Sequence, residues 1–393
     1  MVRRLLVVCN ALDDRTRLER GITTDSPAAS RKVFMMCRTL RRAGVRPIVV
    51  SLGRGRQDGS GRRFGARVRR VDGVPVIYGA FWHRAVLSQL LSLLAPALAL
   101  WRARRLAGAK TALFYNCMPA YVPALLLARL LRWRTVLDLE DGAVAATALP
   151  GVGPVVQATR RLFDRLCTGG ALLACQALEQ STTLRPTACY YGTVEPSADK
   201  ARWPSGALRV LIGGTVAPET GADLLIDGVV MLRLRRPAWA EGLDLQVTGS
   251  GSSIAALRKL AAEPGWPFVT VHGRMTDAGY RQIVDASHVG LALKPRSGPL
   301  ARTTFPSKVI ELAGAGLLLL TTDISDVRAI FGSAALYLED ETPAGLVERL
   351  QWISEQREAA QAIAARGAQT VRTRFAPETV GRSLAGFLFG NAP

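Results

Sequence analysis

The chain has 393 residues, 49% of them hydrophobic, and carries 51 Lys and Arg against 31 Asp and Glu, a formal net charge of +20. This length exceeds one ordinary hydrophobic core, and the apolar content excludes a disordered chain, so two or three globular domains are expected. Residues 1–200 hold 31 basic and 13 acidic side chains, a net +18, whereas residues 201–393 hold 20 and 18, a net +2. The first half is therefore expected to face a polyanion, either nucleic acid or an anionic membrane surface.

The six cysteines form no C-x-x-C pair, and several lie in apolar runs, which is typical of buried free thiols in a reducing cytoplasm. The three histidines, His83, His272 and His288, lack ligand spacing, so no metal site is predicted. The opening apolar run is too short for a signal peptide and is interpreted as a strand. Val86–Trp101 is the segment nearest to a membrane span, but Pro96 interrupts it. This segment is either a buried helix or a helix in the membrane interface.

In the first half, short apolar runs alternate with helical patterns. Ser26–Ala43 has the apolar spacing of a helix and ends before Gly44. Several runs are apolar throughout, as parallel strands buried on both faces should be. The predicted strands are Leu5–Cys9, Pro47–Leu52, Val74–Tyr78, Ala112–Asn116, Thr135–Leu139, Ala171–Cys175 and Thr187–Tyr191.

A stretch rich in Gly, Pro and Ser, placed at 197–207, predicts a linker, after which the alternation restarts. The predicted strands of the second half are Arg209–Gly213, Leu243–Thr248, Phe268–His272, Val289–Leu293, Leu317–Thr321 and Ala335–Leu338. Two βαβ series predict two doubly wound α/β domains, 1–196 and 208–376, with a ligand in the cleft between them. A C-terminal helix over 377–393 is expected to pack back on the first domain.

The stretch LARTTFPSKVIELAGAG (300–316) combines a helix start with two opposite charges, Lys308 and Glu311, on one helical face. Pro306 suits the first helical position, and Thr303 or Thr304 suits the cap. A lysine in the first turn opposes the helix dipole unless an anion such as a phosphate sits in front of it. Glu311 would then accept hydrogen bonds from the vicinal hydroxyls of a ribose. The alternative is an i,i+3 salt bridge on a solvated face.

Three further glycine-rich strand ends accompany this helix. Gly213 and Gly214 follow one predicted strand, Gly249-Ser250-Gly251 another, and Gly273 a third. Glycine lets a ligand approach the backbone closely, although any one such turn is a weak signal.

In order and spacing these segments, with Ser287–Leu291, Pro306-Ser307-Lys308, Glu311, Ala313 and Gly316, resemble the nucleotide-sugar half of GT-B glycosyltransferases. The pattern is most similar to the family 4 (group 1) enzymes of bacterial polysaccharide synthesis. The resemblance covers residues 208–332 in sequence and the first half in architecture only. It implies a GT-B fold of two Rossmann-like domains facing a central cleft.

The resemblance also implies roles for named residues. Glu311 matches the carboxylate that binds the ribose of the donor, and Gly273 with Arg274 lies where the base is met. The residues that match the family's binding segments for the diphosphate and sugar are Gly213, Gly214, Thr215, Gly249, Thr303, Thr304, Phe305, Pro306, Ser307 and Lys308. The sequence departs from the family at Thr303, where an acid is usual, and at Thr215 and Thr220, where Arg and Lys are usual. Lys294, Arg296, Arg302 and Lys308 are the local cations that would replace the missing ones.

On the acceptor side, the strand that ends in Leu139 is followed by Glu140 and Asp141, which become candidate catalytic residues together with Lys308. Asp141-Gly142 has an equally good interpretation as a turn. Asp25, Ser26 and Arg31 lie at a predicted helix start. Asp25 or Ser26 would cap that helix, and Arg31 would meet phosphate or a lipid-linked pyrophosphate.

These features predict a glycosyltransferase that uses a UDP- or GDP-sugar, needs no cofactor or metal, and acts on a lipid-linked or saccharide acceptor. The resemblance implies retention of anomeric configuration. The basic half would hold the enzyme to the inner face of the plasma membrane. Nucleic acid is not expected to bind, because the sequence has no known nucleic-acid recognition motif. The alternatives are a non-catalytic nucleotide-sugar-binding partner in polysaccharide assembly and a GT-B nucleotide-sugar epimerase. A dehydrogenase is disfavoured, because no G-x-G-x-x-G follows the first strand.

Overall fold

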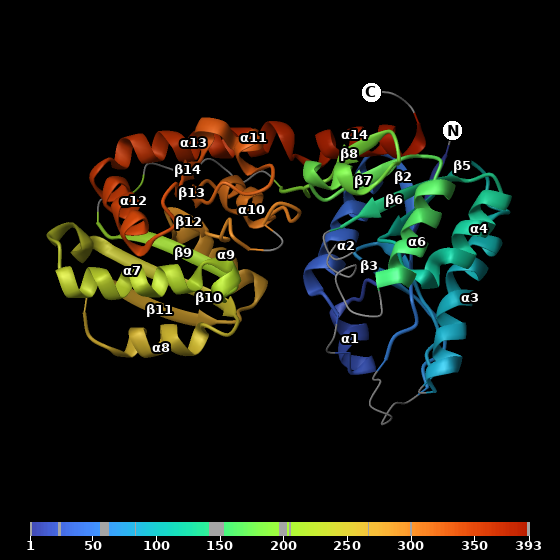
Figure 1. Ribbon diagram of the computed structural model, residues 1–393, viewed down its shortest axis with the longest axis horizontal. Helices are drawn as coiled ribbons and strands as arrows, with labels where there is room; N and C mark the ends of the chain where they lie inside the picture. The colour runs from blue at the N-terminus through green and yellow to red at the C-terminus, as the bar shows by residue number, and fades with distance from the viewer. Residues whose placement is uncertain are drawn as a thin grey trace. The chain divides into compact units, whose positions relative to one another are not determined.

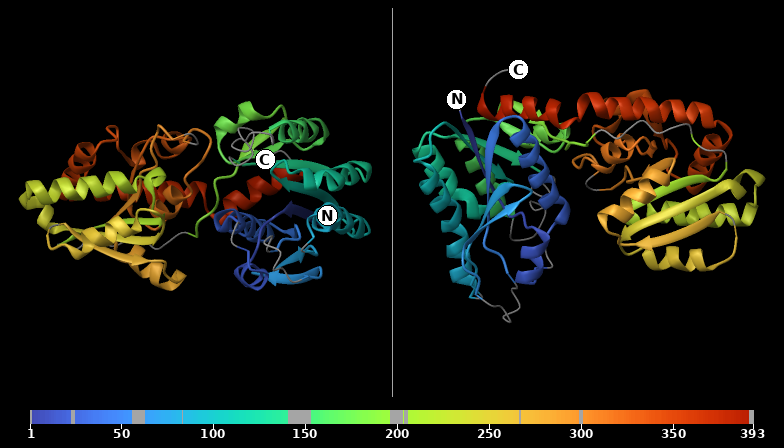
Figure 2. Two further views of the ribbon diagram at one scale, coloured as in Figure 1. Left: turned by 60° about the horizontal axis from the view of Figure 1, so that its bottom comes forward. Right: turned by 180° about the vertical axis from the view of Figure 1, so that it is seen from behind.

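A computed structural model describes residues 2–22, 25–55, 63–82, 84–140, 153–195, 203, 206–265, 267–298 and 301–390. The chain divides into two compact units, residues 1–193 together with 377–393, and residues 194–376. Each unit is a sheet with helices on both faces (Figures 1 and 2). Of the predicted linker 197–207, only Trp203, Gly206 and Ala207 lie within the described residues.

The first unit contains an eight-stranded sheet in the order β3-β4-β2-β1-β5-β6-β7-β8. The strands are β1 (Arg3–Cys9), β2 (Val45–Ser51), β3 (Arg67–Val71), β4 (Val74–Tyr78), β5 (Ala109–Tyr115), β6 (Arg134–Leu139), β7 (Ala171–Leu173) and β8 (Thr187–Cys189). All pairs are parallel except β3 with β4. The sequence did not predict β3, because this edge strand pairs with β4 alone and carries three arginines in five residues, so it lacks an apolar run.

The helices of this unit are α1 (Asp14–Arg20), α2 (Pro27–Arg42), α3 (Ala85–Ala103), α4 (Val122–Leu130), α6 (Gly153–Leu166) and α14 (Pro377–Phe389). The buried face of α2 includes Val33, Met36 and Leu40. The C-terminal helix α14 packs on α2, where a β-carbon at Gly381 would lie 2.9 Å from the carbonyl oxygen of Thr39. Only a glycine allows this approach of the two backbones.

The cysteines follow the sequence prediction. Five of the six are buried, and no disulfide occurs among the described residues. Burial raises the pKa of the Cys9 thiol to about 12, so this side chain behaves as a small apolar group of the core.

The second unit contains a six-stranded parallel sheet in the order β11-β10-β9-β12-β13-β14. Its strands are β9 (Leu208–Thr215), β10 (Leu243–Ser250), β11 (Phe268–Gly273), β12 (Val289–Ala292), β13 (Leu318–Thr321) and β14 (Leu336–Tyr337). Its helices are α7 (Ala222–Arg235), α8 (Ile254–Ala262), α9 (Asp277–Ala286), α10 (Lys308–Gly314), α11 (Val327–Phe331), α12 (Pro343–Glu355) and α13 (Arg357–Arg374).

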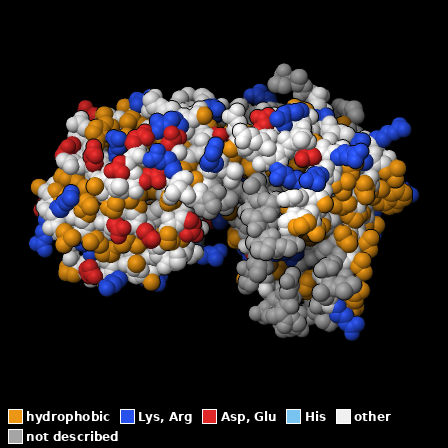
Figure 3. Space-filling view, viewed as in Figure 1, with side chains coloured by type: hydrophobic (Ala, Val, Ile, Leu, Met, Phe, Trp, Pro, Cys, Tyr) orange, Lys and Arg blue, Asp and Glu red, His pale blue; other side chains and the backbone are white. Residues whose placement is uncertain are grey.

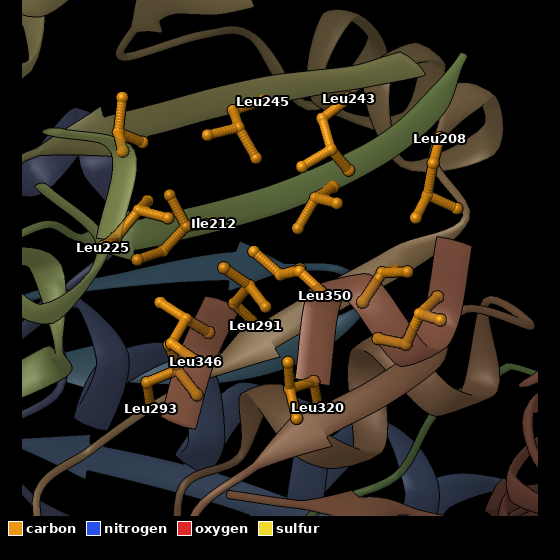
Figure 4. Packing of buried hydrophobic residues seen from close by; sticks show 14 of the residues in the cluster. Leu208, Ile212, Leu225, Leu243, Leu245, Leu291, Leu293, Leu320, Leu346 and Leu350 are labelled. Carbon is orange, nitrogen blue, oxygen red and sulfur yellow. The ribbon is translucent and has the colours of Figure 1, made fainter. Parts of the chain in front are cut away.

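The core of this unit is built mainly from leucines of β9, β10 and β12 and of the helices α7 and α12. Leu208, Leu243 and Leu245 point toward Leu346 and Leu350 across the layer between strands and helices (Figure 4). Trp203 joins this core and is 8% exposed. The apolar runs of the sequence therefore form buried parallel strands, whose carboxyl ends carry the polar and glycine residues of the candidate site.

Candidate functional site

The glycines at the ends of β9 and β10 pack directly against one another in the second unit. Gly214 and Gly249 are paired across the two strands and have φ values of +97° and +110°. A β-carbon at Gly249 would lie 1.9 Å from the carbonyl oxygen of Gly214, and one at Gly251 would lie 2.1 Å from that of Val216. Because any side chain would separate the two strand ends, these glycines shape a close-packed backbone surface.

Lys308, the first residue of α10, extends over this surface. A β-carbon at Gly214 would lie 3.1 Å from Lys308 Cε and 3.8 Å from its Nζ. The Lys308 ammonium donates a hydrogen bond of 2.8 Å to the hydroxyl of Tyr280 and lies 3.3 Å from a carboxylate oxygen of Glu311. The side chains of Lys308 and Glu311 are 32% and 43% exposed, so both charges remain accessible at the strand ends. The i,i+3 salt bridge that the sequence offered as the alternative is thus present, and it lies beside the glycine turns.

The start of α10 differs from the sequence prediction. The helix begins at Lys308 with Ser307 as the preceding cap residue, so Pro306 lies outside the helix rather than at its first position. Neither Thr303 nor Thr304 is close enough in sequence to cap it. The carbonyl oxygen of Pro306 instead accepts the amide of Val309, at 3.0 Å, and this turn leads the chain into the helix.

Two polar side chains of this site were missed by the sequence reasoning. Tyr280 of α9 and Thr248 of β10 both face Gly213, whose β-carbon would lie 2.7 Å from Thr248 Oγ1 and 3.5 Å from the Tyr280 ring. Burial, reinforced by the Glu311 carboxylate, raises the pKa of Tyr280, so its hydroxyl is protonated. Thr248 Oγ1 is buried and has no hydrogen-bond partner among the described residues. The only sequence signal for Thr248 is its position directly before the G-x-G.

The other predicted donor-side residues are less closely grouped. Arg296 is bound to Glu341, with Nε donating at 2.7 Å, and its Nη2 donates to the carbonyl oxygen of Glu339. Thr220 Oγ1 accepts the amide of Ala217, at 3.1 Å, and so serves a turn. Arg274 is exposed after Gly273, which has a φ of +71°. A β-carbon at Gly273 would lie 3.5 Å from the guanidinium of Arg258, a residue that the sequence did not single out. The roles of these residues remain predictions.

The first unit has a second cluster of charged groups at the carboxyl end of β6. Glu140 forms an ion pair with Lys32 of α2, and its amide donates to the side-chain oxygen of Asn116, at 2.8 Å. The Lys32 ammonium lies 5.5 Å from the centre of the Tyr190 ring. Asp138 is 1% exposed, and its ionised carboxylate would have no donor within the described part of the chain. Burial and the neighbouring Glu140 raise the pKa of Asp138, although the positive charge of Lys32 acts in the opposite direction. The raised pKa favours the neutral acid.

The predicted acceptor-side residues have mixed outcomes. Asp141 lies outside the described residues, so its role stays a prediction. Ser26 caps α2 by accepting the amide of Ala29, at 3.3 Å, and Asp25 accepts a hydrogen bond of 2.8 Å from Arg17. Arg31 is exposed on the second turn of α2. Lys32, which the sequence reasoning passed over, is the residue of this helix that contacts Glu140. No cluster of three or more potential metal ligands occurs among the described residues.

Both the sequence and the structure of this chain were compared with those of known proteins. Residues 231–385 match the family model described as Glycosyl transferase-like. No curated protein matches the sequence. The solved structure of Anabaena Alr3699/HepE in complex with UDP is 14% identical, covers 98% of this chain and 99% of its own, and has a TM-score of 0.68. The UDP-forming α,α-trehalose-phosphate synthase of Burkholderia vietnamiensis is 12% identical and has a TM-score of 0.66. The match covers 98% of this chain and 97% of the synthase.

TarM is a third similar structure, 8% identical, with coverage of 98% and 99% and a TM-score of 0.64. The shared fold is GT-B, and the predicted fold class is confirmed. Residues 231–385 thus resemble a glycosyl transferase-like domain within a GT-B fold, whereas glycosyltransferase activity and the narrower assignment to family 4 stay predictions.

Proposed function

From its GT-B fold and its glycosyl transferase-like second unit, we propose that this chain transfers a sugar from a nucleoside diphosphate sugar to a lipid-linked saccharide. The transfer would serve polysaccharide assembly on the cytoplasmic side of a membrane and would retain anomeric configuration. The observation that carries the proposal is the group formed by Lys308, Tyr280 and Glu311 over the joined glycines of β9 and β10. Support comes from the similar structures, of which one holds UDP.

In this proposal the diphosphate of the donor lies over Gly214, where the backbone offers no side chain to obstruct it. Negative charge builds up on the departing phosphate as the bond to the anomeric carbon breaks. The Lys308 ammonium, already oriented by Tyr280 and Glu311, supplies the opposing charge without reorganisation. Glu311 accepts hydrogen bonds from the ribose hydroxyls.

The acceptor would be bound by the first unit, near the end of β6. The Glu140 carboxylate is held by its ion pair with Lys32, and the Glu140 backbone amide is held by the side-chain oxygen of Asn116, so the carboxylate has a defined position. A carboxylate held in this way can accept a hydrogen bond from an acceptor hydroxyl. Asp141 directly follows it in the sequence and remains a candidate for the same task.

Thermal stabilisation tests the donor site. UDP, GDP, ADP and dTDP, and their sugars, are added to the purified protein, and we expect one base to raise the melting temperature. Turnover of the labelled donor with lipid-linked saccharides then separates the enzyme from the non-catalytic nucleotide-sugar-binding partner, which would bind without turnover. A nucleotide-sugar epimerase would instead convert the donor with no acceptor present.

The role of Glu311 has a sharper test of its own. If this carboxylate binds the vicinal ribose hydroxyls, the wild type prefers the ribonucleotide to its 2′-deoxy analogue, and Glu311→Ala binds both alike. A hydrogen bond to a charged group contributes about 1.5–3 kcal/mol, so the preference should be roughly 10- to 150-fold. Equal binding of both nucleotides by the wild type would remove Glu311 from the ribose site.

A further inference from the structure

The helices α3 and α4 of the first unit expose a row of large apolar side chains. The row on α3 has helical spacings of three and four residues and therefore occupies one face. It consists of Leu87, Leu90, Leu94, Leu98 and Trp101, which are 39%, 48%, 61%, 47% and 45% exposed. On α4, which packs against α3, Leu126 and Leu130 are 51% and 77% exposed. Figure 3 shows hydrophobic side chains gathered over these two helices.

The charges that α3, α4 and the segments beside them in sequence bring to this face are all of one sign. No Asp or Glu occurs between Asp72 and Asp138, whereas that stretch contains eight Lys and Arg. The exposed arginines at the ends of the two helices are Arg84, Arg102, Arg105, Arg129 and Arg132. Arg104 stacks on Trp101, with its guanidinium carbon 3.4 Å from the ring centre, and so places a further cation beside the apolar row.

We infer that the α3–α4 face, defined by these apolar and basic residues, is the surface by which the protein binds an anionic lipid bilayer. Leucines reach the acyl boundary, Trp101 lies at the headgroup level, and the arginines bind lipid phosphates. The inference deepens the proposed membrane association by naming its surface and is independent of sugar transfer. Among the described residues, every helix falls short of the length and apolarity that crossing a bilayer requires, so the α3–α4 face would lie on the membrane.

Two other occupants fit this face less well. A second copy of the chain would bring the arginines of the two α3–α4 faces together with no acidic side chain in either to pair with them, and like charges repel. Nucleic acid would leave the exposed leucines without an apolar partner, since proteins bind it through cations and stacked aromatic rings rather than through rows of leucine side chains. A bilayer with anionic headgroups satisfies both the apolar row and its basic ends.

Vesicle co-sedimentation without any nucleotide tests this inference. The full chain is mixed with phosphatidylcholine vesicles, with or without phosphatidylglycerol, at low and at high salt. The disrupting variant is Leu94→Glu with Leu98→Glu. The matched control is Leu18→Glu with Leu234→Glu, since Leu18 and Leu234 are 81% and 80% exposed on α1 and α7 and the charge change is the same. All four positions are exposed, so thermal melts of both variants should match the wild type.

We expect binding to require phosphatidylglycerol, to fall with salt, and to drop at least about tenfold in the disrupting variant, with the control within about twofold of the wild type. Replacing Arg102 and Arg105 by Gln should weaken binding about 25-fold, at about fivefold for each charge, in anionic vesicles only. Equal binding by the disrupting variant, or equal binding to neutral vesicles, overturns the inference. Failure to bind vesicles, combined with a wild-type dimer that the disrupting variant makes monomeric, assigns the face to a second copy instead. The donor assay uses no lipid, so the two proposals fail separately.

Discussion

Replacing Lys308 by Met distinguishes a phosphate-binding lysine from one that serves only a salt bridge. The substitution keeps the aliphatic chain over Gly214 and removes the ammonium. The pair with Glu311 is 32% and 43% exposed, so its loss should lower the free energy of unfolding by no more than about 0.5 kcal/mol. For a domain of this size that corresponds to a fall of roughly 1–2 °C in the melting temperature.

The effect of the same change on donor binding should be much larger. A hydrogen bond from an ammonium to a phosphate contributes about 1.5–3 kcal/mol, so the Kd of the nucleoside diphosphate should rise roughly 10- to 150-fold. Calorimetric titration with the nucleotide that stabilises the wild type measures this rise. The control is Lys259→Met, an exposed lysine of α8. An unchanged Kd for Lys308→Met, together with a fall of more than about 5 °C, would show that the charge is structural and refute the assignment.

Three further predictions concern the strand ends. Gly249→Ala should abolish nucleotide binding and lower the melting temperature, because its β-carbon would lie 1.9 Å from the Gly214 carbonyl oxygen. The control Gly242→Ala has open space around the new methyl group and should change neither property. Calorimetry measures both properties for both variants. Tyr280→Phe should weaken nucleotide binding about 2- to 12-fold in the same titration, because Lys308 loses one of its two partners. The raised pKa of Asp138 means that the folded protein keeps a proton that the unfolded chain loses above about pH 4, so wild-type stability falls as pH rises from there. The stability of Asp138→Asn relative to the wild type should therefore increase between about pH 4 and pH 8. Urea unfolding of both proteins at these two pH values measures it, and an equal difference in unfolding free energy at both would contradict the prediction.

The sequence by itself determined the fold class and most strands, for a local reason. Runs such as Leu5–Cys9 and Leu317–Leu320 are apolar at every position, and this pattern belongs to strands buried on both faces of a parallel sheet. The edge strand β3 was not predicted, because its three arginines leave no apolar run. Similarly, Lys308, Glu311 and the glycine turns could be found because each lies in a short segment with its own chemical logic.

Only the tertiary structure decided which of these segments meet. Tyr280 and Thr248 reach Gly213 from the start of α9 and the end of β10, and no local pattern records that these two ends meet. Lys32 lies more than a hundred residues from Glu140 in sequence and pairs with it because α2 packs beside the end of β6. The apolar content of 85–103 was visible in the sequence, yet its exposure on α3 depends on which face the sheet covers. Pairing across the chain and the choice of a buried face are properties of packing, so residue order alone does not reveal them.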